Sequence, residues 1–328
     1  MIYDVAIIGA GPAGSMLSRL LTGKKIALFD ARPLDRPYQK GDRIKSCGGL
    51  LAPDSQAFLK KLGITLPPEI IDPSQPSKGI KTTDLNKNIT RYYKRNYINL
   101  DREAFDRFLL KDINADCFFS TLVNSIKDNS DHFVINNSVK AKIIVGADGA
   151  GSIVRRIFFP SFKPRQYASI QEIFSKKSSE FECFFDHTKT NYYGWALPKG
   201  SNTLLGFALP AEKSAPQKFS QLKKQLNYSA PISKEGTIII RPKFFHPITC
   251  SKRVFLIGEA GGYISPSSAE GISYAFKTAQ ILANSQLNIN SFRYKMLKIK
   301  LDILYKNLKS IFMYNRILRQ LIMHLTRK

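Results

Sequence analysis

The hydrophobic positions of residues 2–30 follow a strand–helix–strand pattern. A short apolar run at 3–8 leads into a glycine-rich turn, and apolar residues then recur at helical spacing before a second apolar run at 25–29. Short apolar runs of this kind are typical of strands buried in a parallel sheet, which a crossover helix connects. The pattern predicts a βαβ unit at the start of the chain.

Two other patterns follow further along the chain. Between about 160 and 248, β-branched and aromatic residues are interrupted by Pro, Gly and Ser, which indicates an antiparallel sheet. From 288 onwards the apolar period is helical and repeats every seven residues, at Leu297, Leu304, Ile311, Leu318 and Leu325. We therefore expect an α/β fold, in which a Rossmann-type domain carries an inserted antiparallel β-sheet domain and a C-terminal helical tail.

The glycine-rich turn has the spacing of a dinucleotide-binding loop. Gly9 allows the tight turn, Gly11 lets the backbone approach a pyrophosphate, and Gly14 lets the helix pack closely on the strand. The N-terminus of the helix then offers N–H groups to the phosphates. Asp30 ends the second strand, where it can accept ribose hydroxyls of an adenosine. The motif predicts a dinucleotide, without separating NAD from FAD.

Three later segments resemble FAD motifs of the flavoprotein hydroxylase and reductase superfamily. Residues 143–155 contain Asp148 and Gly149 and are similar to its Asp-Gly motif, and 99–109 are similar to its arginine-bearing helix. Residues 254–276 are similar to its second FAD segment, in which an acid binds the ribityl chain and a glycine-opened helix faces the flavin. The acid is Glu259 here, one methylene longer than the usual Asp.

The resemblance implies FAD as the cofactor. No second glycine motif follows a strand elsewhere, so we expect the electron donor, NADPH or a reduced electron carrier, to act without a dedicated domain. The implied cofactor-binding residues are Gly9, Gly11, Ala13, Gly14, Asp30, Ala31, Arg32, Lys45, Cys47, Gly48, Gly49, Arg102, Asp148, Gly149, Glu259, Gly262, Gly271 and Ile272.

Two segments narrow the resemblance to the geranylgeranyl reductase family, whose members saturate C=C bonds of polyprenyl chains with reduced FAD. One is Lys45-x-Cys47-Gly48-Gly49, and the other, at 190–200, is similar to the family's Pro-x-x-Tyr-x-Trp-x-Phe-Pro signature. The second segment departs from the signature at its first Pro and at Phe. The resemblance implies that the catalytic residues are Cys47, Tyr193 and Trp195, with both aromatic rings on one face of a strand. A buried inert thiol and a plain core strand remain alternatives.

The predicted domains are discontinuous. We expect an FAD-binding domain of 1–75, 99–158 and 249–287, a substrate domain of 76–98 and 159–248, and basic amphipathic C-terminal helices at 288–328.

The charge is strongly positive. The chain has 50 Lys and Arg against 25 Asp and Glu, and the segment from Phe292 to Lys328 alone carries ten basic residues and one acid. A basic amphipathic helix is typical of a membrane-surface element, although it can equally pack on its own domain with a solvated basic side. Nucleic acid is not expected, because no recognition motif accompanies the charge.

The remaining composition indicates a cytoplasmic protein, with peripheral membrane attachment left open. The start of the chain reads as a strand rather than a signal peptide, and no apolar run is long enough to span a bilayer. Cys47, Cys117, Cys183 and Cys250 lie far apart without a His cluster, so neither a disulfide framework nor a metal site is expected. The sequence does not indicate an oligomeric state.

The leading functional hypothesis is a reductase that transfers hydride from reduced FAD to a polyprenyl lipid. An FAD-dependent monooxygenase or halogenase acting on an aromatic substrate is the first alternative. The second is a flavin-binding or lipid-binding protein without turnover.

Overall fold

The computed structural model describes residues 1–76, 79–245, 247 and 249–325, and it forms two compact units. Unit 1 comprises 1–45, 103–165 and 240–306, and unit 2 comprises 46–102, 166–239 and 307–328. Each unit is therefore assembled from three separate stretches of the chain. Positions 77, 78, 246, 248 and 326–328, which fall in the predicted substrate domain and tail, lie outside the described residues.

Unit 1 contains the predicted Rossmann-type sheet, in the order β7-β2-β1-β10-β9-β8, with β16 also paired to β10. The pairs of β1 with β2 and β10, of β2 with β7, and of β10 with β16 are parallel. The strands are β1 (Ile2–Ile8), β2 (Ile26–Phe29), β7 (Asp116–Phe118), β8 (Ile126–Asp128), β9 (Phe133–Ile135), β10 (Val139–Gly146) and β16 (Val254–Leu256).

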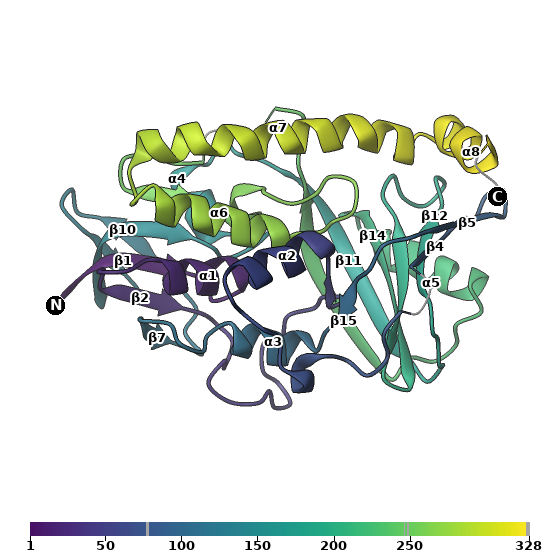
Figure 1. Cartoon of the computed structure of the whole chain (residues 1–328), viewed down its shortest axis with the longest axis horizontal. Coiled ribbons are helices and arrows are strands. Elements are labelled where there is room, and N and C mark those ends of the chain that lie inside the picture. The colour runs from purple at the N-terminus through teal and green to yellow at the C-terminus, as the bar shows by residue number, and fades with distance from the viewer. Residues whose placement is uncertain (77–78, 246, 248, 326–328) are drawn as a thin grey trace. The chain divides into compact units, whose positions relative to one another are not determined.

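The helices of unit 1 cover this sheet. In Figure 1, α1 and α6 lie side by side next to β1 and β10. Apolar side chains of the strands, among them Ile8, Phe29, Ile144 and Leu256, pack in one buried cluster with α4. The helices are α1 (Pro12–Leu20), α3 (Arg102–Phe108), α4 (Ile153–Phe158), the 3-10 helix η2 (Gly258–Gly261), α6 (Ile272–Asn284) and α7 (Ile289–Tyr314), of which α3 begins and α7 ends in unit 2.

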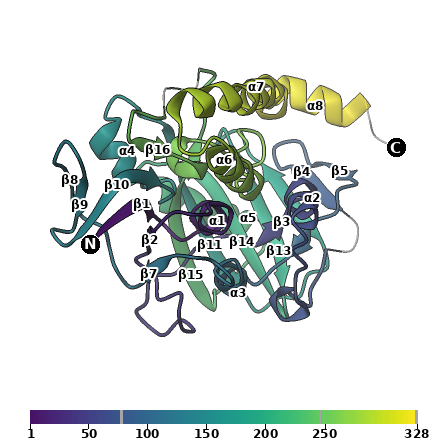
Figure 2. The same ribbon diagram turned by 60° about the vertical axis from the view of Figure 1, so that its left-hand side comes forward.

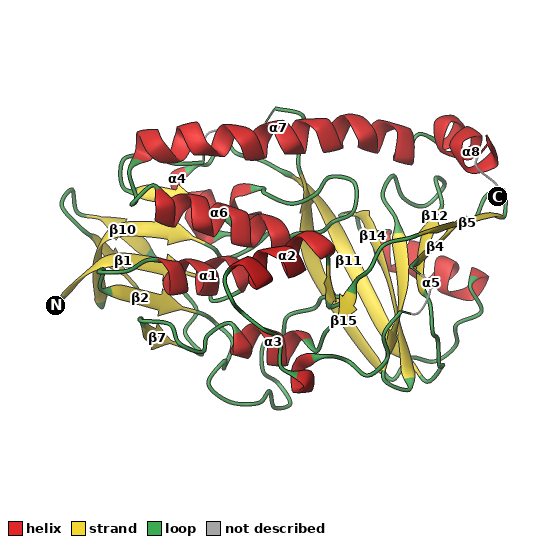
Figure 3. Cartoon of the chain, in the orientation of Figure 1, coloured by secondary structure: helices red, strands yellow, loops and turns green. Residues whose placement is uncertain are grey.

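Unit 2 contains the predicted antiparallel sheet, in the order β15-β11-β14-β13-β12-β4-β5 (Figure 3). One pair, β12 with β4, is parallel. The strands are β4 (Ile80–Asp84), β5 (Ile89–Tyr93), β11 (Arg165–Phe174), β12 (Phe181–Phe185), β13 (Gly194–Lys199), β14 (Asn202–Pro210) and β15 (Ser233–Arg241), and a separate short pair joins β3 (Leu50–Leu51) to β6 (Ile98–Asn99).

The core of unit 2 is aromatic. Phe174, Phe184, Phe207 and Phe219 pack together, with Phe219 supplied by α5. Gly194 and Phe207 are paired across β13 and β14, where the Phe207 ring fills the space that a Cβ on Gly194 would take. The helices are α2 (Pro53–Lys61), the 3-10 helix η1 (Pro68–Ile70), α5 (Ala215–Gln225) and α8 (Arg316–Leu325).

The units divide the chain at points other than those predicted. Residues 46–75 and 99–102 group with the antiparallel sheet instead of the Rossmann sheet, because β3 pairs with β6 and the Asn99 amide donates to Pro198 O at 2.7 Å. Residues 240–248 group with unit 1, where Ile240 N donates to Glu259 at 2.9 Å. The predicted tail is divided, with 288–306 in unit 1 and 307–328 in unit 2.

Candidate functional site

The turn between β1 and α1 is open on one side only. Gly9 has a φ of +103°, and a Cβ there would lie 2.5 Å from Ala147 O. A Cβ on Gly14 would lie 1.9 Å from Gly9 O, so glycine is required where the helix crosses the strand. At Gly11, in contrast, the nearest atom to an added Cβ is Arg32 Nη2 at 3.9 Å. The space in front of Gly11 is a cradle that a ligand can fill.

The N-terminus of α1 points its positive dipole end at this space. Pro12 occupies the first turn, and no side chain of the described residues caps the helix. Uncapped N–H groups and the helix dipole together favour an anion. The glycine turn and α1 therefore fit a pyrophosphate.

The predicted ribose ligand Asp30 is already well supplied with donors. Its Oδ2 accepts from Ala10 N at 2.8 Å and from Arg32 Nη2 at 2.9 Å, and its Oδ1 accepts from Arg32 N at 2.9 Å and Nε at 3.0 Å. Asp106 pairs with Arg32 Nη1 at 2.6 Å. Burial works to lower the pKa of Arg32, but the two carboxylates outweigh it and raise that pKa. Because a carboxylate has about four acceptor positions, a ribose contact at Asp30 requires Arg32 to give up one of them.

Asp148 has an acceptor to spare. Its Oδ2 accepts from Ile153 N at 2.7 Å, at the start of α4, while its buried Oδ1 has no hydrogen-bond partner among the described residues. Burial raises the pKa of this carboxyl. The neighbouring Gly149 adopts a φ of +71°. A buried acceptor without a donor is costly, so Asp148 Oδ1 fits a ligand hydroxyl.

Glu259 directs its carboxylate to the end of β15, where Oε1 accepts from Ile240 N at 2.9 Å. Burial raises its pKa, and Lys45 and Arg155 act in the opposite direction. Arg155 was not singled out from the sequence, yet it joins the two FAD motifs by donating to Ala150 O and, at 2.8 Å, to Ala260 O. The sequence around Arg155, four residues after Gly151, contains no pattern that predicts these contacts.

Two of the remaining predicted residues of unit 1, Ala13 and Gly262, lie at the η2 turn. A Cβ on Gly258 would lie 2.9 Å from the Ala13 Cβ, which brings α1 against the turn, and Gly262 ends η2 with a φ of +76°. Ala31 lies between Asp30 and Arg32 in the loop after β2. The N-terminus of α6 at Ile272 follows Gly271 and already holds a carboxylate, because Glu270 Oε1 accepts from Ser273 N at 2.7 Å.

In unit 2, the predicted cysteine lies beside the predicted arginine. Arg102 Nη1 donates to Cys47 Sγ at 2.9 Å. The next residues run close to other backbone and side chains, because a Cβ on Gly48 would lie 2.6 Å from Leu197 Cδ1 and one on Gly49 would lie 2.5 Å from Leu100 O. The loop of residues 47–49 therefore lies against β13.

One face of β13 carries Trp195, Leu197 and Lys199, since alternate residues of a strand share a face. The centroids of the Tyr193 and Trp195 rings are 5.6 Å apart, and Tyr193 directly precedes β13. The Trp195 ring packs over Gly206 of β14. Within the described part of the chain, its buried indole N–H has no hydrogen-bond partner. A donor in this position can meet a polar group of a ligand.

Lys199 and Asn99 were missed by the sequence reasoning. Lys199 Nζ donates to Asn99 Oδ1 at 2.7 Å and to Leu100 O at 2.9 Å, and a Cβ on Gly49 would lie 2.7 Å from it. Burial lowers the pKa of Lys199, which nearby Asp72 partly offsets. The alternation from Trp195 through Leu197 could have indicated that Lys199 belongs to the same face.

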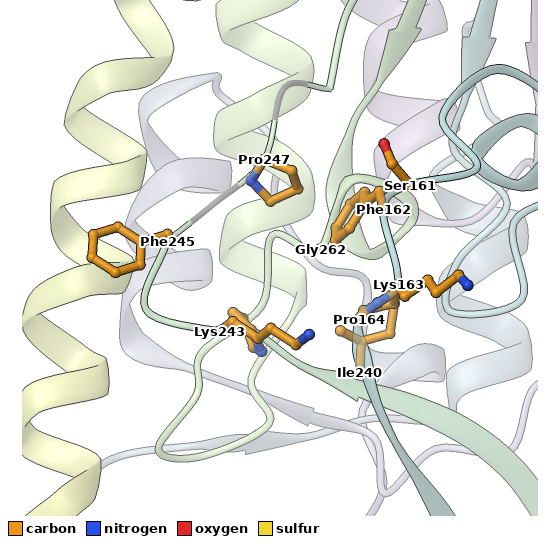
Figure 4. Close-up of a pocket in the computed structure, with 10 residues that line it drawn as sticks. Ser161, Phe162, Lys163, Pro164, Ile240, Lys243, Phe245, Pro247 and Gly262 are labelled. Atoms are coloured by element: carbon orange, nitrogen blue, oxygen red, sulfur yellow. The ribbon is translucent and has the colours of Figure 1, made fainter.

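A separate small pocket lies beside the η2 turn in unit 1 (Figure 4). It has a volume of about 120 Å³ and is lined by Phe162, Lys163, Ile240, Lys243 and Gly262 among others. Among the described residues, no group of three or more His, Cys, Asp or Glu is arranged to hold a metal ion.

Comparison with known proteins identifies close relatives. Protein CbrA of Escherichia coli O6:H1 strain CFT073 is 36% identical over 346 residues, covering 98% of this chain and 93% of the relative. Protein CbrA of Shigella dysenteriae serotype 1 is also 36% identical, over 345 residues, covering 98% and 96%. The chain belongs to the CbrA family. No protein-family model matches this CbrA-family chain.

Solved structures show the fold of this CbrA-family protein. A geranylgeranyl bacteriochlorophyll reductase-like protein from Thermoplasma acidophilum has a TM-score of 0.80 at 18% identity, covering 100% of this chain and 92% of that one. PqsL from P. aeruginosa in complex with 2-aminobenzoylacetate has a TM-score of 0.73 at 16% identity, covering 99% and 100%. Halogenase PltM in complex with phloroglucinol and FAD has a TM-score of 0.70 at 16% identity, and the match covers 98% of this chain and 79% of that one. The fold is that of FAD-dependent oxidoreductases.

In the part of the chain that the structure describes, no helix combines the length and the apolar character needed to cross a membrane.

Proposed function

We propose that this protein binds FAD and uses it to reduce C=C bonds of a polyprenyl lipid of the geranylgeranyl type. One observation carries the proposal: the 47–49 loop packs against Trp195, Leu197 and Lys199 of β13 in unit 2. The two segments that resemble geranylgeranyl reductases are about 150 residues apart in the sequence and yet form one cluster. The fold similarity to the Thermoplasma reductase-like protein supports the same substrate class.

The residues of unit 1 fit the cofactor. The open side of Gly11 and the uncapped start of α1 suit the pyrophosphate, and the spare Asp148 Oδ1 suits a hydroxyl of the ligand. When bound and reduced, FAD supplies a hydride that goes to one carbon of the alkene. The electrons come from an external donor, NADPH or a reduced electron carrier.

The second alkene carbon needs a proton, and Cys47 is our candidate to hold it at Sγ. Arg102 Nη1 donates to this sulfur at 2.9 Å, a contact that stabilises the thiolate left after the proton has gone. Water then returns the proton to Cys47, so the cysteine is unchanged over the cycle. Cys47 therefore acts as an acid and forms no covalent bond.

The aromatic pair Tyr193 and Trp195, at the start of β13, is proposed to bind the hydrocarbon chain. Tyr193 and Trp195 lie side by side and present apolar rings with few polar atoms. Burial raises the pKa of Tyr193 well above its ordinary value, so this side chain stays neutral at physiological pH. A neutral aromatic wall excludes water and orients an apolar substrate for hydride transfer.

Two other functions remain candidates. An FAD-dependent monooxygenase or halogenase acting on an aromatic substrate is favoured by the similarity to PqsL and to halogenase PltM. A flavin-binding or lipid-binding protein without turnover is the second alternative.

An anaerobic single-turnover experiment tests the proposal. The purified protein is loaded with FAD, reduced chemically and mixed with a geranylgeranyl lipid, and the flavin absorbance and the lipid mass are followed together. We expect the flavin to reoxidise while the lipid gains two hydrogens per flavin, since hydride and proton add across one double bond. Flavin that stays reduced until oxygen enters, and then reoxidises faster with an aromatic acid present, would favour the oxygenase. Flavin indifferent to every acceptor would favour the non-turnover protein.

A further inference from the structure

Helix α7 is apolar on two faces. The buried face carries Phe292, Met296, Ile299 and Ile303, at spacings of three and four residues. A second row at the same spacings is exposed to solvent, with 49% to 76% of each side chain accessible, and consists of Tyr294, Leu297, Leu301, Tyr305, Leu308 and Phe312. Of the stripe predicted from the sequence, Leu297 and Ile311 are exposed and Leu304 is half-buried. Large apolar side chains gathered in one exposed row mark an interaction surface.

Basic residues border the exposed row. Lys295, Lys298, Lys306 and Lys309 each directly follow a residue of the row. Lys298 and Lys309 are exposed, while Lys295 Nζ donates to Asn284 O at 2.7 Å. The helix carries one acid, Asp302, which pairs with Lys306 at 3.1 Å and accepts from the Tyr274 hydroxyl. The border of the apolar row is therefore positive.

Helix α8 has an exposed apolar side of its own. Ile317, Leu321 and Leu325 recur every four residues and are exposed. The opposite side of α8 is anchored in unit 2, because the Arg319 guanidinium lies 2.8 Å from Asp84 and Met323 is buried. The anchor holds the apolar side of α8 towards solvent. Figure 1 shows α8 following the end of α7.

We propose that the exposed apolar row of α7, with its lysine border, binds an anionic lipid bilayer, lying in its interface without crossing it. An apolar row bordered by lysines is the arrangement that places hydrocarbon side chains among acyl chains and ammonium groups among lipid phosphates. The described helices are too polar to span a membrane, which agrees with a helix lying in the interface. The inference does not depend on the flavin chemistry, because none of its residues belongs to the candidate cofactor or catalytic set.

The charge around the exposed row favours an anionic bilayer over a second copy of the chain as its binding partner. Pairing two α7 helices through Leu301 and Leu308 would bring the lysine borders of both copies together, and each border has four lysines against the single acid Asp302. Like charges at such positions oppose helix pairing, whereas the negative surface of an anionic bilayer attracts each lysine. The charge pattern therefore selects lipid.

Vesicle binding by the full-length protein tests the proposal. The protein is sedimented with vesicles of phosphatidylcholine alone, or with roughly one third phosphatidylglycerol, at low and high salt. We expect binding to the anionic vesicles at low salt and its loss at high salt. The double variant Leu301→Gln/Leu308→Gln removes two exposed apolar side chains, and we expect its affinity to fall about tenfold or more.

The double variant Leu122→Gln/Ile232→Gln is the matched control. Both residues are exposed apolar side chains, at 51% and 61%, and lie outside α7 and α8. We expect it to bind as the wild type does. Equal vesicle binding by both double variants would overturn the proposal. Failure of the wild-type protein to sediment with anionic vesicles at low salt would overturn it as well. A dimer that the L301Q/L308Q variant dissociates, with no change in vesicle binding, would assign the face to a second copy.

Discussion

The Arg319 side chain lies 2.8 Å from the Asp84 carboxylate, and both residues are buried. The pair joins α8 to the end of β4, across 235 residues of sequence. Arg319 also donates to Met313 O at 3.0 Å and lies over the Phe185 ring. Its guanidinium is thus surrounded by an anion, a carbonyl and an aromatic face.

Replacing Asp84 by Asn should destabilise unit 2, because it leaves the buried Arg319 charge without its counterion. Breaking a buried pair costs about 3–5 kcal/mol of unfolding free energy, which urea denaturation measures. The exposed pair Lys218–Glu212, 3.1 Å apart, is the control, and Lys218→Ala should cost less than about 1 kcal/mol. Equal losses in the two variants would contradict a special role for Arg319.

Substitutions at two glycines of the nucleotide loop should have different effects, one on the stability of the protein and the other on FAD binding. Gly14→Ala places a Cβ 1.9 Å from Gly9 O, so we expect a large fall in the melting temperature of the apoprotein. Gly11→Ala meets no atom closer than 3.9 Å, so it should leave the apoprotein stable but reduce the FAD content of the purified protein. Normal FAD retention in Gly11→Ala would exclude this cradle as the pyrophosphate site.

Cys47→Ala should leave FAD bound and slow lipid reduction, by about 100-fold if the thiol is the proton donor. Anaerobic flavin reoxidation measures the rate, and flavin absorbance measures retention. Cys117→Ala, at an exposed thiol outside the candidate site, should behave as wild type. Full activity in Cys47→Ala would remove the residue from the mechanism.

Glu259 should make stability depend on pH in a defined direction. Burial raises its pKa in the folded protein above the ordinary value of 4.5, so the folded state binds a proton more tightly than the unfolded state. Wild-type apoprotein should therefore lose stability, relative to Glu259→Gln, as the pH rises from 4.5 through the raised pKa. Urea denaturation of both proteins across this range gives the difference. A difference that stays constant with pH would show that Glu259 titrates normally.

The nucleotide half of the site was predictable because its signals are local. The spacing of Gly9, Gly11 and Gly14 between a strand and a helix fixes the turn, and the structure has that turn where it was expected. The environment of Asp30 was not predictable, because Asp106, 74 residues after Arg32, helps to hold the guanidinium over it. The roles assigned to the cofactor-binding residues remain predictions.

The presence of an antiparallel sheet was predicted from the sequence, but the full set of strands that form it was not. β4 joins the sheet through a parallel pair with β12, about 100 residues later, and the short β3–β6 pair carries no sequence pattern of its own. These distant pairings move 46–75 into unit 2. The helical period of α7 was also correct, but a heptad count could not tell which face is buried, because both faces are apolar.

The interleaved construction of unit 2 sets an order of events during synthesis. Asp84 is made early, but its counterion Arg319 follows 235 residues later. At about 5–20 residues per second, the ribosome needs roughly 10–50 s to cover that interval. During this time the strand that bears Asp84 cannot be buried in its final form without leaving a carboxylate uncompensated. Completion of unit 2 therefore waits for α8, and a nascent protein stalled before this helix would expose the end of β4 to chaperones and proteases.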